Sequence, residues 1–137
     1  MTGFPEMAVQ PPANYRGGEL EYKMGIEFLE LTAERSVARM PVIGNRQGIS
    51  MLHGGAHVVL AESLGSISAA LHAGEGRYAV GIEVNASHSR GVTDAWVTAT
   101  CEALHLGRTL CTHQVVISDE KGRRCSTVRI TSMLRDR

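Results

Sequence analysis

One carboxylate stands alone in a long uncharged stretch of the sequence. Between Gln47 and Ala73 the only residue with a formal charge is Glu62, and its neighbours are mostly small, apolar or hydroxylated. A carboxylate in such surroundings costs free energy unless it is paired or used. Active sites often contain such carboxylates, as do structural networks. Glu62 is therefore the first candidate for a catalytic group, and a solvated helix glutamate is the alternative.

Backbone donors precede this carboxylate. The run His53-Gly54-Gly55 stands directly before a helical pattern, and the first N–H groups of a helix have no internal partner. The two glycines carry no Cβ, so these donors are accessible at the positive end of the helix macrodipole. Such donors can stabilise a carbonyl oxygen that gains negative charge. A tight turn into a helix without a ligand is the alternative.

The pair His53 and His57 has the spacing of two metal ligands on one helix face. In the HExxH pattern of metalloproteases a glutamate directly follows the first histidine. Here Gly54 takes that place. The pattern fails, so the sequence predicts no metal site and no bound cofactor.

Basic side chains occur at one strand end and in one turn. His88 and Arg90 end a strand-like segment, and Arg108 lies in a turn further along. Arginine binds phosphate groups through paired hydrogen bonds. We predict that these three residues form a small cationic cluster, which is either a phosphate anchor or a solvated strand end.

A long helix must position the central residues. Residues 54–73 carry apolar side chains at intervals of three to four residues, which predicts a helix that ends at Gly74. The apolar stripe, which we expect in the core, consists of Leu60, Leu64, Ile67 and Leu71. Glu62 and Ser66 lie on another face, beside Gly65, where small side chains predict close packing.

Strand-like segments flank this helix. One precedes it at 32–40, and four follow it at 77–89, 95–106, 110–118 and 124–134. The short connections predict an antiparallel meander. The predicted fold class is α+β, a single domain in which an antiparallel five-stranded sheet wraps around a long central helix.

The composition argues against several classes of protein. Lys+Arg and Asp+Glu number 14 each, so no net field attracts nucleic acid or an anionic membrane. The three cysteines include no CxxC pair, which predicts free thiols. The N-terminal segment resembles neither a signal peptide nor a membrane span. We expect a cytoplasmic protein with an N-terminal extension at 1–24 and one domain at 25–137.

The motifs around Glu62 resemble those of one enzyme family. The runs are QGISMLHGG at 47–55, LAESLGS at 60–66, VGIEVNASH at 80–88, LHLG at 104–107, DEKGR at 119–123 and RIT at 129–131. They are similar to the hotdog-fold thioesterases of the 4-hydroxybenzoyl-CoA and 1,4-dihydroxy-2-naphthoyl-CoA hydrolase type, including phenylacetate-pathway and enterobactin-proofreading relatives. The resemblance covers residues 25–134. It implies a hotdog domain, at least a homodimer with shared active sites, and a homotetramer built as a dimer of dimers.

The resemblance also implies roles for single residues. Glu62 matches the catalytic carboxylate, acting either as nucleophile or as the base for a water. The Gly55 N–H and the Gln47 side chain match groups that act on the thioester carbonyl, and His53 lies beside it. Ser66 matches a hydroxyl group that holds the water. The loop with Gln47 and the helix with Glu62 come from opposite subunits in this family.

Further residues match positions that bind the substrate. His88 and Arg90 match contacts to the CoA nucleotide, and Arg108 is a candidate phosphate contact. The other residues expected at the substrate are Gly54 at the start of the helix, and Ile49, His57 and Ile67 in the acyl pocket.

The function implied is hydrolysis of an aromatic or hydroxylated acyl-CoA to the free acid and CoA, with 1,4-dihydroxy-2-naphthoyl-CoA as one candidate substrate. A proofreading thioesterase that acts on acyl groups misloaded on an acyl carrier protein is the first alternative. A hotdog binding protein without catalytic activity, or a dehydratase-type relative, is the second. Comparing free CoA thioesters with carrier-bound ones separates the two hydrolases.

Overall fold

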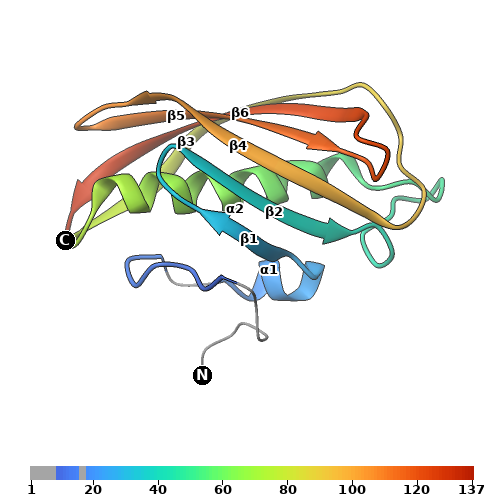
Figure 1. The fold of residues 1–137 in the computed structure, drawn as a ribbon, viewed down its shortest axis with the longest axis horizontal. Coiled ribbons are helices and arrows are strands. Elements are labelled where there is room, and N and C mark those ends of the chain that lie inside the picture. The colour runs from blue at the N-terminus through green and yellow to red at the C-terminus, as the bar shows by residue number, and fades with distance from the viewer. Residues whose placement is uncertain (1–8, 16–17) are drawn as a thin grey trace.

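The computed structural model describes residues 9–15 and 18–137. Figure 1 shows one long helix, α2 (Gly54–Ala73), lying along the inner face of an antiparallel sheet. The sheet has six strands in the order β1-β2-β4-β5-β6-β3. The strands are β1 (Glu27–Leu31), β2 (Arg35–Pro41), β3 (Arg77–His88), β4 (Trp96–Leu106), β5 (Leu110–Ser118) and β6 (Arg124–Asp136).

The predicted helix is confirmed, with its apolar stripe packed against the sheet. Leu60, Leu64 and Ile67 are completely buried. The small-residue face is also closely packed, because a Cβ atom at Gly65 would lie 2.5 Å from the Cγ2 atom of Ile130 on β6. Only glycine allows α2 to approach β6 this closely.

The sheet differs from the prediction in two ways. Residues 27–41 form a hairpin, β1 and β2, so the sheet has six strands and not five. The predicted meander holds for β4, β5 and β6, but β3 pairs with β6 at the far edge of the sheet. The reason lies in the segment after β3, which crosses the start of α2 instead of turning back. The Leu52 N–H donates to the Val92 carbonyl on this segment, at 2.7 Å.

Strand β3 leaves one edge of the sheet without a strand partner among the described residues. It contacts β6 through eleven paired positions, from Arg77 opposite Asp136 to His88 opposite Ser126. Its apolar side chains remain in solvent, with exposed fractions of 44% for Val80 and 50% for Ile82. A long, apolar and unpaired edge is the kind of surface that pairs with a further strand.

The N-terminal segment lies on the side of α2 away from the sheet (Figure 1). It includes the short helix α1 (Glu19–Met24). The Asn14 Nδ2 atom donates to the carbonyl of Ala70 at 2.7 Å, and lies 3.2 Å from that of Gly74. Both carbonyls lie at the end of α2, where the Ala70 carbonyl also accepts from the Gly74 N–H and the Gly74 carbonyl from the Arg77 N–H. Of the predicted extension at 1–24, residues 1–8 and 16–17 lie outside the described residues.

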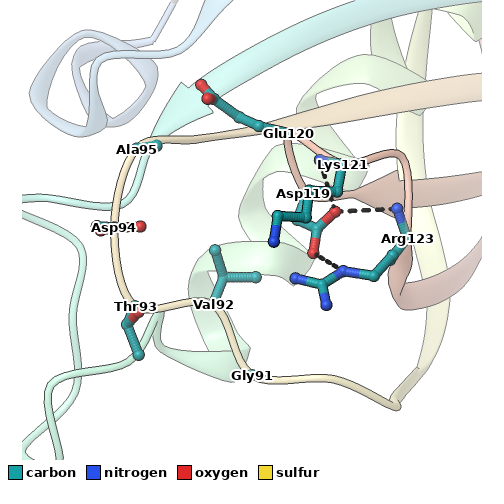
Figure 2. A pocket seen from close by; sticks show the side chains of 9 residues that line it. All are labelled: Gly91, Val92, Thr93, Asp94, Ala95, Asp119, Glu120, Lys121 and Arg123. Carbon is teal, nitrogen blue, oxygen red and sulfur yellow. Dashed lines mark hydrogen bonds and ion pairs between the residues drawn. The ribbon is translucent and has the colours of Figure 1, made fainter.

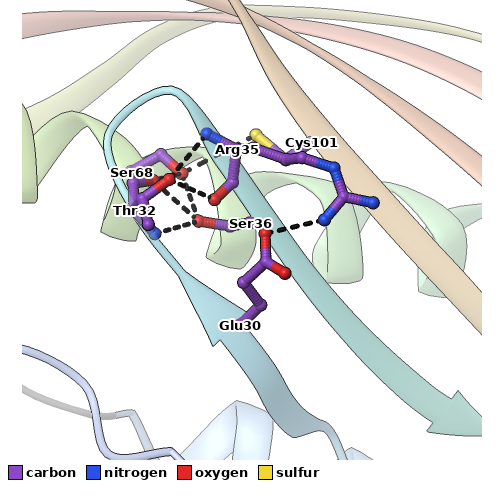
Figure 3. A network of polar contacts seen from close by, with 6 residues as sticks. All are labelled: Glu30, Thr32, Arg35, Ser36, Ser68 and Cys101. Atoms are coloured by element: carbon purple, nitrogen blue, oxygen red, sulfur yellow. Dashed lines mark hydrogen bonds and ion pairs between the residues drawn. The ribbon is translucent and has the colours of Figure 1, made fainter.

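A buried hydroxyl network ties α2 to the β1–β2 turn (Figure 3). The Ser36 and Ser68 Oγ atoms are 2.7 Å apart, and each lies 2.9 Å from the Thr32 carbonyl, to which it donates. Cys101 lies beside them, and burial raises the pKa of its thiol to about 12. All three cysteines are free, as predicted, and all three are buried. The network is structural, because its polar atoms satisfy one another.

Candidate active site

Glu62 lies half-buried on α2, at the wall of a cavity of about 260 Å³. Ser66, one turn further along the helix, lines the same cavity, so two of the predicted catalytic residues lie together. Glu62 leans toward the edge strand, because its Oε2 atom lies 3.7 Å from the position of a Cβ atom at Gly81 on β3. The carboxylate thus lies beside the unpaired edge of the sheet.

The opposite wall of this cavity comes from the N-terminal segment, which the sequence did not indicate. Tyr15, Leu20 and Glu21 line it, together with Val59 of α2. The Tyr15 hydroxyl donates to the buried carboxylate of Glu21. Burial and this hydrogen bond raise the pKa of Tyr15, so its hydroxyl stays protonated. The wall therefore combines apolar side chains with one polar pair.

At the start of α2, one of the two predicted donors is already occupied. His53 is the N-cap residue, and its Nδ1 atom accepts a hydrogen bond from the Gly55 N–H at 2.8 Å. The Gly55 N–H is thus not available to a carbonyl in this arrangement. Within the described residues, the Gly54 N–H has no hydrogen-bond partner. Of the two predicted donors, the Gly54 N–H is therefore the available one, whereas the resemblance implied the Gly55 N–H.

A second cavity of about 280 Å³ surrounds this donor. The predicted residues that line it are Gln47, Gly54, His57, His88 and Arg90, with Met51, Leu52, Ser89 and Gly91. The loop, the helix start and the end of β3 thus bring five predicted residues to one place.

His57 is the most deeply buried titratable group at this cavity, with 3% of its surface exposed. Its ring stacks on that of His88, with centroids 5.3 Å apart and planes at 27°. Burial, and secondarily the neighbouring His88, lowers the pKa of His57 from 6.5 to about 4. His57 is therefore neutral at neutral pH.

The lowered pKa of His57 predicts a loss of stability in acid. In the unfolded chain His57 binds a proton below its ordinary pKa of 6.5. In the folded chain it binds that proton only below about pH 4. The free energy of unfolding is thus unaffected by this group above pH 6.5. It declines as the pH falls toward about 4, and His57 accounts for at most about 3 kcal/mol of the decline. Urea unfolding at both ends of this range should show a smaller decline for His57→Phe than for the wild type. Equal declines would contradict the assignment, since His113, whose pKa burial also lowers, titrates in both proteins.

The two cavities share no lining residue. Gly54 and Glu62 are eight residues apart on one helix, which is roughly 12 Å along its axis. A carbonyl held by the Gly54 N–H is therefore far from the carboxylate of the same chain. Within one chain, the predicted carboxylate and the available donor therefore lie at separate cavities.

Within one chain, three of the predicted substrate-binding residues lie away from the cavity with Glu62. Arg108 lies at the opposite end of α2 from His88 and Arg90, because its turn contacts the last turn of the helix through a hydrogen bond of 2.7 Å from His72 to the Gly107 carbonyl. The predicted cationic cluster therefore does not form within one chain. Ile67 is completely buried in the core, and Ile49 is 69% exposed on its loop. Neither lines the cavity with Glu62.

A third cavity, of about 240 Å³, lies between loop 91–95 and turn 119–123 (Figure 2). The carboxylate of Asp119 is its most prominent polar group. It accepts hydrogen bonds from the backbone N–H of Lys121 and Arg123, at 3.0 and 2.9 Å, and from the Arg123 side chain at 2.8 Å. These bonds, led by that of the Arg123 N–H, lower the pKa of Asp119. Asp119 holds the turn together and has no catalytic arrangement around it.

Comparison with known proteins places the chain in a family. Residues 50–126 match the model of the thioesterase superfamily. The proofreading thioesterase EntH of Cronobacter turicensis is 42% identical over 116 residues, which are 84% of this chain and 85% of that protein. EntH of Klebsiella pneumoniae is 44% identical over 108 residues, covering 78% of this chain and 79% of that protein.

Solved structures agree with this result. A thioesterase of Haemophilus influenzae has a TM-score of 0.82 at 34% identity, covering 85% of this chain and 82% of that one. A mutant thioesterase of Pseudomonas aeruginosa has a TM-score of 0.83 at 38% identity, covering 86% of each chain.

The chain therefore belongs to the thioesterase superfamily. Its fold is the hotdog fold of that superfamily, and its activity is the hydrolysis of thioesters. Among the described residues, no helix is both long enough and apolar enough to cross a membrane.

Proposed function

We propose that the protein hydrolyses the CoA thioester of an aromatic or hydroxylated acid, in an active site that two copies of the chain complete. One observation carries this proposal: Glu62 and Ser66 line one cavity, whereas Gln47 and the Gly54 donor line another, roughly 12 Å away along the helix. Reacting atoms must approach to about 3–3.5 Å. The Glu62 that meets a carbonyl at Gly54 therefore belongs to a second copy.

The unpaired edge of β3 supports the same assembly. Antiparallel pairing of two β3 strands would extend the sheet across both copies and cover Val80 and Ile82. It would also bring Glu62, which leans toward Gly81 on β3, to the seam between the copies. A homotetramer would then be a pair of such dimers.

In the proposed reaction the Gly54 N–H and the Gln47 side chain polarise the thioester carbonyl. Glu62 of the second copy either attacks the carbonyl carbon or takes a proton from a water that attacks it, with Ser66 holding that water. The carbon–sulfur bond breaks, and the thiolate leaves and is protonated. If water attacks, this step gives the free acid directly. If Glu62 attacks, it gives a mixed anhydride with Glu62, which a water then hydrolyses to release the acid and restore the carboxylate. The water supplies the oxygen and the protons of both products. One well-placed donor at such an oxyanion contributes about 3 kcal/mol.

The acyl group would occupy the cavity beside Glu62. Leu20 and Val59 offer apolar contact, and the Tyr15–Glu21 pair, whose one hydroxyl proton is already donated to Glu21, offers acceptor oxygens. This mixture favours an acyl group with a hydroxyl substituent. A site discriminates strongly between two substrates when the wrong one leaves a buried polar group of the site without a hydrogen-bond partner.

The CoA end of the substrate would meet basic side chains from both copies. Arg90 lines the cavity at the Gly54 donor. Antiparallel pairing of β3 would bring the first residues of one strand to the last residues of the other. Arg77, at the start of β3, donates to the Arg108 carbonyl at 3.1 Å, so Arg108 would approach the Arg90 end of the second copy.

A second candidate is an enzyme that removes misloaded acyl groups from a carrier protein. The observation that favours it is the name of two relatives, proofreading thioesterase, at 42% and 44% identity. Arg90 and Arg108 would then bind an acidic carrier surface instead of CoA phosphates.

The experiment is thiol release measured on four thioesters, with Glu62→Gln as the blank. The substrates are benzoyl-CoA, a hydroxynaphthoyl-CoA, a medium-chain aliphatic acyl-CoA and a benzoyl-loaded carrier protein. Rapid turnover of the two aryl-CoA substrates supports the proposal. A preference for the carrier-bound thioester favours the second candidate, and a preference for the aliphatic substrate contradicts the assignment of the acyl cavity.

A further inference from the structure

His57 has no role in the proposed reaction, yet it lines the cavity at the Gly54 donor. Its Nδ1 atom is buried without a hydrogen-bond partner. Leaving a polar atom buried and unpaired costs about 1–3 kcal/mol. An apolar side chain could fill the same space without that cost, so packing alone does not explain a histidine here.

Three contacts restrain the ring of His88, the neighbour of His57, although His88 is an exposed residue. Its Nδ1 atom lies 2.9 Å from the Oγ atom of Ser126, which is completely buried. Its other ring edge lies against Gly54, where a Cβ atom would be only 2.9 Å from Nε2. The ring of His57 stacks against its face, with centroids 5.3 Å apart.

We propose that His57 is a positioning residue, whose buried ring fixes the His88 ring against Gly54 and so sets the geometry of the carbonyl-binding donor. The inference rests on the proposed role of Gly54. His88 has hydrogen-bonding restraint at one ring nitrogen only, so Ser126 alone leaves its ring plane free to rotate. The stack removes that freedom, because aromatic rings at this spacing attract each other and exclude other orientations.

The neutral state of His57 suits this role. Two charged imidazoles in contact would repel each other, and the start of α2 carries partial positive charge. Burial keeps the pKa of His57 at about 4, so its ring stays uncharged beside His88 at neutral pH. No other titratable side chain lines this cavity apart from His88 and Arg90, among the residues that the structure describes.

The test compares variants of His57 in the intact enzyme. His57→Ala removes the ring and should lower kcat by about 10-fold to 100-fold, the cost of a misplaced reacting group. His57→Phe keeps a flat ring and should retain kcat within about threefold. Val58→Ala, which shortens the adjacent side chain in the same helical turn, is the control and should behave like the wild type.

The substrate form gives a second readout. The same loss of kcat is expected with an acyl-CoA and with the acyl thioester of N-acetylcysteamine, which lacks the nucleotide. A loss confined to the CoA substrate, seen in KM, would mean that His88 serves only the nucleotide and would overturn the proposal. Equal loss in His57→Phe and His57→Ala would overturn the stacking role.

A double-mutant cycle tests whether His57 acts through His88. In a His88→Ala background, His57→Ala should cause no further loss of kcat, because the ring it positions is absent. Independent losses that multiply would contradict the proposal. If His57→Ala fails to fold, His57→Leu replaces it, because leucine keeps the bulk of the side chain without a flat ring. Full turnover in His57→Leu would also contradict the proposal.

One readout does not depend on turnover. In proteins labelled with carbon-13 at histidine Cε1, the His88 signal should sharpen and shift in His57→Ala but not in His57→Phe or Val58→Ala. An unchanged signal overturns the inference. If the wild type hydrolysed none of the thioesters tested, the proposed function would be contradicted. The His88 signal would still test whether His57 fixes the position of the His88 ring.

Discussion

Glu62→Gln is expected to lower kcat for thioester hydrolysis by about 10²–10⁴-fold, or more if the carboxylate acts as nucleophile. Glutamine has the size of glutamate but neither attacks a carbonyl nor takes a proton from water at neutral pH. Glu62 is half-buried and lines a cavity with Ser66. KM should change little, because the carboxylate contributes to the transition state more than to binding.

Folding and assembly provide the control for this variant. Glu62→Gln should elute and unfold like the wild type, since the side chain forms no ion pair in the described part of the chain. Glu30→Gln is a matched charge change on the exposed hairpin, where Glu30 pairs with Arg35 at 2.7 Å. It should retain full turnover. Undiminished hydrolysis by Glu62→Gln would rule out the catalytic assignment.

Two inactive variants should restore activity to each other. Glu62→Gln loses the carboxylate half of the site, and Gly54→Val blocks the donor half by forcing a side chain into His88. In a heterodimer both lesions fall in one site and the other site is intact. Heterodimers should therefore have about half of the wild-type activity per dimer.

The measurement uses both variants expressed together with different affinity tags and purified through both tags in turn. A heterodimer of the wild type with Glu62→Gln is the control and should also retain about half of the activity. If the doubly tagged dimers are as inactive as the two parent variants, each site lies within a single chain. That result would contradict the shared-site model.

The helix and most strands could be predicted because their signals are local. The apolar period and the glycines after Ala73 define α2 at both ends, and the four later strands begin and end within two residues of their predicted limits. The partner of β3 could not be predicted in this way. Which strand β3 pairs with depends on the path of the segment that contains Val92, and no residue pattern within a strand records that path.

For the site, too, contacts between residues close in sequence were easier to predict than contacts between distant ones. The motif predicted which residues gather at the start of α2, because they are close in sequence or match a known pattern. Spacing could not reveal that the His53 side chain caps Gly55, since that depends on a side-chain rotamer. Nor could it place Tyr15 and Glu21 opposite Glu62, because no local pattern joins positions more than forty residues apart.

If the acyl group occupies the cavity beside Glu62, as proposed, the N-terminal segment makes that cavity modular. Its anchor is Asn14, which binds carbonyls at the end of α2, and its inner surface is the wall formed by Tyr15, Leu20 and Glu21. None of these residues belongs to α2 or to the sheet. Substitutions in this segment could therefore change the wall of the proposed acyl cavity while α2 and the residues proposed for catalysis stay the same.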